Sequence, residues 1–246
     1  EGSYNATYCI LSAEGDSFNL TSSQSCLLGD IDLDFPTGNE QQVYQSSIVN
    51  LDLASLQALA ITNDTYYDEQ ELLDANLPID GKLNNNVLYF TGAASYSIDS
   101  SYTFRNSESL GAGTIVIDGD LYINQNLEYE QGLIDNLEGL ASVAFIVLGD
   151  VYVDETVSDV VGSYIVLGDT GIFYTGDDSD IPIPDTELFG NQFVLHGMVI
   201  AKEISLDRVY FEGLAAAEIF VYDGRVLVNT PPGLVNIVGY LPNWIR

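Results

Sequence analysis

The chain has 246 residues, of which 37 are acidic and only 6 are basic, so its formal net charge is −31. A surface this negative repels nucleic-acid phosphates and anionic lipids, which argues against both as partners and favours divalent cations. Its hydrophobic residues (46%) are enough for a sizeable core, and its 16 Tyr and 22 Gly favour strands and turns over helices.

The two cysteines, Cys9 and Cys26, are expected to form a disulfide if the protein is exported, the alternative being two unrelated thiols. One His and two Cys do not complete a zinc site, so zinc is not expected.

The chain opens at Glu1 and not at Met, which suggests either a removed signal segment or a trimmed sequence. No apolar run approaches the roughly 20 residues that span a bilayer, so membrane insertion is not expected. Sequons at Asn5, Asn19 and Asn63 permit glycosylation without indicating it.

Residues 1–86 are expected to form a mixed N-terminal region containing one or two short helices. Apolar residues recur at helical spacing over 51–61. A second helical piece is expected from about 68 to 75, because it starts with acidic residues and Pro78 lies just beyond its end.

Residues 87–230 contain an imperfect repeat of two apolar runs around a glycine. The repeated glycines fall at irregular intervals, as in a solenoid whose loops vary in length. The five units are 115–123 around Gly119, 145–153 around Gly149, 164–172 around Gly168, 193–200 around Gly197 and 219–228 around Gly224.

Two all-β folds fit these units. Asp-Gly between apolar runs is a hairpin signal and would give an antiparallel β-sandwich. Only Gly119 and Gly224 are preceded by Asp, however, and a Leu or His in a left-handed turn position is costly. One left-handed glycine at a corner fits all five units, and near-continuous apolar runs suit strands buried on both faces. The sequence therefore favours a parallel β-solenoid, with the antiparallel sandwich as the alternative.

Several segments also carry a resemblance. They are GDLYI at 119–123, AFIVLGDVYVDETV at 144–157, and the ending that begins AEIFVYDGRVLVNTPPGL at 217 and closes with LPNWIR. Over residues 87–246 the chain resembles uncharacterised exported proteins of candidate-phyla (Patescibacteria-type) bacteria. The resemblance implies repetitive β structure and a cell-surface location, and it supplies no catalytic residues.

Aspartates flank the repeat glycines at positions 118, 120, 150, 169 and 223. A carboxylate pair of this kind is used in glycoside hydrolysis, but its recurrence in successive units favours a turn role. If the corners stack, Asp120, Asp150 and Asp169 form a column of like charges. Such a column is expected either to face solvent or to hold Ca²⁺.

An acidic loop provides a second candidate calcium site, formed by Asp177, Asp178, Asp180 and Asp185, although a solvated loop is the competing interpretation. The acidic run over 30–34 lacks the glycine and glutamate of a calcium-binding EF-hand loop. His196 is the only histidine and has no nucleophile motif around it, so a structural role is expected. The tyrosines provide a possible sugar-binding platform, but their dispersal favours core positions.

Residues 231–246 form an apolar C-terminal tail that needs cover. It either caps its own subunit or docks on a neighbouring one. The residues assigned to this contact are Leu234, Val235, Ile237, Val238, Tyr240, Leu241, Trp244 and Ile245.

The sequence thus predicts an extracellular structural protein without enzymatic activity. It is expected to self-associate into a surface filament, sheath or layer, with no cofactor other than Ca²⁺. The alternatives are a monomeric adhesin or carbohydrate-binding module and, less favoured, a polysaccharide-active β-helix enzyme.

Overall fold

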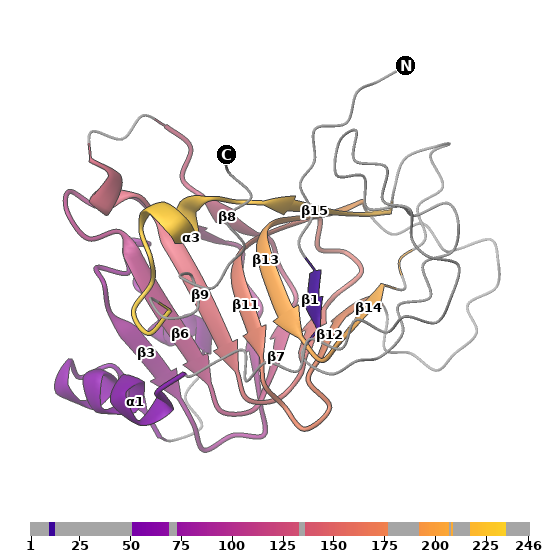
Figure 1. The fold of residues 1–246 in the computed structure, drawn as a ribbon, viewed down its shortest axis with the longest axis horizontal. Helices are drawn as coiled ribbons and strands as arrows, with labels where there is room; N and C mark the ends of the chain where they lie inside the picture. The colour runs from indigo at the N-terminus through magenta and orange to yellow at the C-terminus, as the bar shows by residue number, and fades with distance from the viewer. Residues whose placement is uncertain are drawn as a thin grey trace.

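The computed structural model of the chain describes residues 10–12, 51–68, 73–132, 136–176, 192–206, 208 and 217–234, the first stretch by its backbone alone. These residues form a strand-rich fold with few helices (Figure 1), which confirms the β-rich class. The helical elements are α1 (Leu53–Thr62), α2 (Leu73–Asn76), α3 (Arg225–Val228) and the 3₁₀ turn η1 (Leu137–Gly139).

The strands form three sheets, which we call A, B and C. Every strand pair in the described residues is parallel, so the antiparallel sandwich is wrong for these units. Sheet A has the order β1 (Ile10–Ser12), β13 (Phe193–Ala201), β11 (Asp159–Val166), β9 (Ser142–Val147), β6 (Ala112–Ile117), β3 (Val87–Phe90) and β2 (Tyr66–Tyr67), with β15 (Glu218–Tyr222) also pairing with β13. Sheet B has the order β14 (Glu203–Leu206), β12 (Ile172–Thr175), β10 (Val151–Val153), β7 (Asp120–Ile123) and β4 (Ser95–Ile98), and sheet C pairs β5 (Tyr102–Phe104) with β8 (Leu127–Tyr129).

The chain visits these sheets in a fixed order. It runs from sheet A to sheet B, and in the first two rounds also to sheet C, before it returns to sheet A beside the strand it left. We call each round a pass: β3 to β5, β6 to β8, β9 to β10, β11 to β12, and β13 to β14. Because each return is parallel, equivalent residues of successive passes lie next to one another.

The middle strands of sheet A, β3, β6 and β9, are buried on both faces, as their continuous apolar runs predict. One face meets sheet B across a core that includes Phe90, Phe145 and Leu121. The other face carries a second apolar cluster that includes Val116 and Ile146. Aromatic rings continue along the first core from pass to pass, for example Phe145 and Tyr164, whose centroids lie 4.8 Å apart in nearly parallel planes.

The helix predicted over 51–61 is confirmed as α1. Asp52 caps it by accepting a hydrogen bond from the Ser55 backbone N–H at 3.0 Å. Leu56 and Ala60 face the second apolar cluster and are buried. Of the second predicted helix, about 68–75, the described residues from Leu73 on are helical as α2 (Leu73–Asn76), and residues 69–72 lie outside the described part.

The left-handed glycine predicted at every repeat corner is wrong. Of the five repeat glycines, only Gly119 has a positive φ (154°). Gly197 lies inside strand β13 and not at a corner, in register with Gly162 of β11. Gly224 has a φ of −70° and precedes a short helix, so the strand predicted after it is also wrong.

Gly149, Gly168 and Gly197 are required for a different reason, which is the close approach of backbones in successive passes. A Cβ on Gly149 would lie 2.6 Å from the carbonyl oxygen of Gly119, and one on Gly168 would lie 2.5 Å from that of Gly149. A Cβ on Gly197 would overlap the carbonyl oxygen of Gly162. These positions therefore exclude any side chain.

This difference predicts opposite outcomes for two glycines that look equivalent in the repeat. We expect Gly197→Ala to lower the free energy of unfolding by about 3 kcal/mol or to prevent folding, since backbone must move to admit the methyl group. A Cβ at position 224 has open space around it, so Gly224→Ala should change the free energy of unfolding by less than about 1 kcal/mol. Urea unfolding monitored by circular dichroism measures both. Equal effects would contradict the close-approach explanation.

Candidate interaction surfaces

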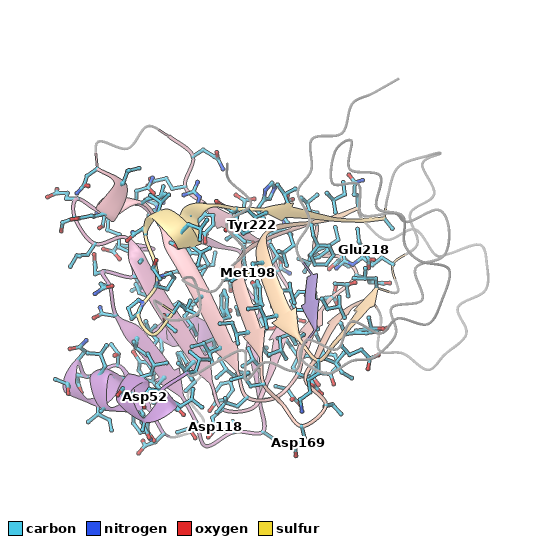
Figure 2. The ribbon with its side chains drawn as sticks, in the orientation of Figure 1. Asp52, Asp118, Asp169, Met198, Glu218 and Tyr222 are labelled. Atoms are coloured by element: carbon cyan, nitrogen blue, oxygen red, sulfur yellow. The ribbon has the colours of Figure 1, made fainter. Side chains whose placement is uncertain are left out.

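The predicted aspartate column is only partly formed. Asp120 and Asp150 are equivalent in neighbouring passes, whereas Asp169 lies outside this register, in the turn between β11 and β12. Figure 2 places Asp118 and Asp169 along the rim where the strands of sheet A end. The three-carboxylate column that the sequence suggested is therefore wrong for Asp169.

The two carboxylates that do stack make hydrogen bonds between passes. Oδ1 of Asp120 accepts from the backbone N–H of Asp150 at 2.9 Å. The buried Asp150 carboxylate accepts from the Ile172 backbone N–H at 2.8 Å and from the Thr170 hydroxyl at 2.6 Å. Each carboxylate thus ties its own pass to the next one. This contact is the turn role expected for the repeated aspartates.

The other acidic candidates have separate surroundings. Asp118 accepts a hydrogen bond from the Thr91 hydroxyl at 2.7 Å. Asp223 forms an ion pair with Arg225 at 3.1 Å. Across the part of the chain that the structure describes, no group of three or more His, Cys, Asp or Glu side chains is arranged to hold a metal ion. The predicted calcium ligands Asp177, Asp178, Asp180 and Asp185, the acidic run at 30–34 and both cysteines, Cys9 and Cys26, lie outside the described residues.

His196 is a half-buried strand residue. It lies in β13, in register with Val161 of β11 and Val221 of β15. It is therefore not at a corner, and its immediate strand partners are apolar.

A row of tyrosines follows the outer face of sheet B, which is the face away from the core. Tyr122, Tyr152 and Tyr174 are register partners in β7, β10 and β12, and each is half-buried between fully buried neighbours. The rings of Tyr122 and Tyr152 stack at 4.9 Å, and those of Tyr152 and Tyr174 lie 6.1 Å apart. Serines continue the row at both ends, Ser97 in β4 and Ser205 in β14.

The rings of Tyr122 and Tyr152 stack on each other, so the ring faces that meet in this pair are not presented to solvent. These three tyrosines are far apart in the sequence, and the register of the passes brings them side by side. We call this row, from Ser97 to Ser205, the tyrosine row.

Residues 225–234, which we call the crossing segment, lie over the outer face of sheet A (Figure 1). Leu234 is fully buried in the second apolar cluster, together with Leu56 of α1. The carbonyl of Pro232 accepts a hydrogen bond from the Thr114 hydroxyl of β6 at 2.7 Å. The first residue of the predicted docking tail thus packs against its own chain. The remaining residues of that tail, from Val235 to Ile245, lie outside the described part.

Two side chains fasten the crossing segment to the loop before β9. The Arg225 guanidinium lies 4.3 Å from the ring centroid of Tyr129 and donates to the carbonyl of Ala141 at 3.3 Å. Asn229 donates to the carbonyl of Leu140 at 2.7 Å. Burial raises the pKa of the Tyr129 phenol above its usual range, so this ring stays neutral beneath the cation.

The buried Arg208 connects β15 and β13 to the loop that precedes β11. Arg208 donates hydrogen bonds to the carbonyls of Val157 and Asp154, and its guanidinium lies 4.6 Å from the ring centroid of Phe193. Its backbone N–H donates to Glu218 at the start of β15 at 3.2 Å. Burial lowers the pKa of Arg208, and the nearby acidic groups oppose that shift. This residue carried no sequence signal.

The two ends of the stacked strands differ. At the first end, residues 73–83 cover the first pass: Leu73, Leu77 and Leu83 enter the core, and the Gly81 carbonyl accepts from the Arg105 backbone N–H at 2.8 Å. At the other end, β14 has two exposed residues, Glu203 and Leu206, and all five residues of β15 are only half-buried. Figure 1 shows α1 and β3 at one end of the row of strands, and β1 and β14 at the other.

The chain matches no protein-family model, no curated protein and no solved structure. No helix in the described ranges has the length and apolar character required to cross a bilayer. What the tyrosine row and the last-pass end could bind therefore follows from the residues that form them.

The hydrogen bonds between passes give a second prediction. Asp150→Asn keeps the size of the side chain but removes its charge and turns an N–H₂ group toward groups that donate, so the free energy of unfolding should fall by about 2 kcal/mol. Asp169→Asn makes the same chemical change at an exposed turn that is not in register with Asp120 and Asp150. Its free energy of unfolding should stay within about 0.5 kcal/mol of that of the parent protein. Urea unfolding at neutral pH measures both. If Asp150→Asn left the free energy of unfolding unchanged, the proposed stabilisation by hydrogen bonds between passes would be contradicted.

Proposed function

We propose that the chain is an extracellular structural protein, a subunit that self-associates into a filament, sheath or layer. In this proposal the passes are successive coils of a parallel β-solenoid. Residues 73–83 lie at its first end, β1 and β15 pair with β13 in the last pass, and residues 231–234 lie across the outer face of sheet A. The observation that carries the proposal is the asymmetry of the two ends. Residues 73–83 cover the first pass on the side of β4 and β5, whereas β14 and β15 at the other end keep exposed or half-exposed apolar side chains.

The register of the passes supports an assembly along the stacking direction. On the outer face of sheet A, one row runs through Tyr89, Val116, Ile146, Ile165 and Ile200, one residue from each pass. Rows of like residues allow a further strand to be added with the same spacing and the same side-chain contacts. An end strand also presents unpaired backbone groups that a partner strand satisfies.

The charge sets a condition on such an assembly. Two copies that each carry a formal charge of −31 repel one another, and salt screens exposed charges over about 8 to 10 Å at physiological strength. We therefore take the assembly to require salt or divalent cations, including Ca²⁺, without assigning a specific site. The location outside the cell is part of the same proposal, and in that oxidising location Cys9 and Cys26 are expected to form a disulfide. No catalytic role is proposed, because the stacked Asp120 and Asp150 bind backbone and hydroxyl donors.

The test places one charge at each of two exposed leucines. Leu206 lies on the end strand β14 and is 40% exposed, whereas Leu137 lies on η1, away from that end, and is 59% exposed. We expect Leu206→Lys to abolish or strongly reduce assembly and Leu137→Lys to leave it unchanged. Light scattering and negative-stain microscopy in a Ca²⁺ and salt series measure the effect. A parent protein that stays monomeric throughout the series would overturn the proposal.

Carbohydrate binding is the second candidate, and the tyrosine row is the observation that favours it. A row of tyrosines and serines at regular spacing suits a neutral polysaccharide laid across the strands, since the negative surface repels acidic polymers. The strands are about 4.8 Å apart, so a polymer running along the row meets a similar side chain at each step.

Affinity electrophoresis in gels containing a neutral polysaccharide tests this candidate. Tyr122→Phe and Tyr152→Phe together keep the stacked rings but remove two hydroxyls, so retardation by the polysaccharide should fall several-fold while the fold is kept. Tyr164→Phe is the control, because that ring is fully buried in the core. The carbohydrate candidate fails if the parent protein is not retarded, or if the double variant is retarded as strongly as the parent.

A further inference from the structure

The outer edge of β13 is shared by two strands from opposite ends of the sequence. β15 pairs with Phe193–Gly197, and β1 pairs with Val199–Ala201 in the same parallel sense. Together they complete the edge that β13 presents away from β11. Without β1, the last three residues of β13 would keep an open backbone edge.

The covalent connection does not force β1 onto its own chain. The described chain resumes at Leu51 and leads into α1, which packs on β3 at the opposite end of sheet A. From β3 to β13 there are four strand intervals, about 20 Å in all. The intervening residues 13–50 span up to roughly 125 Å when fully extended, so the same connection reaches the β13 of a neighbouring copy.

We propose that β1 is exchanged between copies, so that in the assembled protein residues 10–12 of one subunit complete the β13 edge of the next. This inference rests on the proposed self-association and gives it a specific contact. Exchange preserves the register of Ile10, Leu11 and Ser12 against Val199, Ile200 and Ala201, so little is lost when the partner is another copy. A three-residue pairing at the end of a sheet also opens easily, because it has few hydrogen bonds to break.

The geometry of the exchange favours an open chain of subunits. The donated strand and the receiving edge are different surfaces of the same molecule, so each subunit gives one contact and receives another. Heterologous contacts of this kind generate filaments whenever the rotation between subunits does not close a ring. The receiving edge lies at the last-pass end, together with the partly exposed β14 and the half-buried β15, which is the end already assigned to assembly.

Mixed cysteine variants test the exchange directly. Ser12 and Ala201 are register partners, and neighbouring strands lie within the Cα spacing that a disulfide requires. Both residues are small, so Ser12→Cys and Ala201→Cys change little else.

The two single variants are expressed together in one cell, and the protein is then assembled, oxidised and digested. A disulfide between position 12 and position 201 then requires two copies, and we expect it in the assembled fraction. Each single variant alone is the control for disulfides with Cys9 or Cys26, which fragment mass spectrometry separates by position.

The double variant with both changes in one chain gives an independent result. Exchange predicts a ladder of disulfide-linked oligomers on a non-reducing gel, whereas pairing within the chain gives only a linked monomer. Assembly in the microscope without any disulfide from position 12 of one copy to position 201 of another would overturn the exchange and leave self-association standing. A linked monomer together with no assembly would overturn both.

Discussion

Successive passes of the backbone meet at glycine contacts too close for any side chain, and most of the described structure follows from that contact. The Gly162–Gly197 pair holds β11 against β13, and the line of Gly119, Gly149 and Gly168 holds the turns of three passes together. Because the strands are parallel and in register, the carboxylates of Asp120 and Asp150 reach backbone donors of the next pass. The same register gathers the tyrosines on sheet B and the apolar rows on sheet A.

A fold built this way has two ends and an outer face that need cover. The outer face of sheet A receives α1 and the crossing segment, with Leu234 and Leu56 meeting in one apolar cluster. At the first end, residues 73–83 cover β4 and β5, and β2 pairs with β3. At the last end, β1 from the N-terminal part of the chain pairs with β13, and β14 stays partly exposed. The proposed self-association and strand exchange both follow from this unequal cover.

Continuous apolar runs identified the doubly buried strands β6 and β9, and the spacing of Leu56 and Ala60 identified α1, because burial and local periodicity leave a direct mark in sequence. The role of the glycines was not readable, since Gly197 in a strand and Gly149 at a turn look alike until their partners are known. Asp169 was misaligned for the same reason: loop lengths between β11 and β12 shift its register. Arg208 and the tyrosine row depend on contacts between distant segments, which no local pattern reveals. The acidic loop predicted to bind Ca²⁺, which contains Asp177 to Asp185, and the two cysteines lie outside the described residues.

The central claim is that copies of this chain continue one stack of parallel strands from subunit to subunit. Cryo-electron microscopy of the native material, assembled in salt and Ca²⁺, measures this most directly. The account predicts filaments or layers in which strands about 4.8 Å apart run without interruption across the junction, with the last pass of one copy facing the next. Isolated particles, or assemblies joined through the outer face of sheet A with the end strands left open, would contradict it.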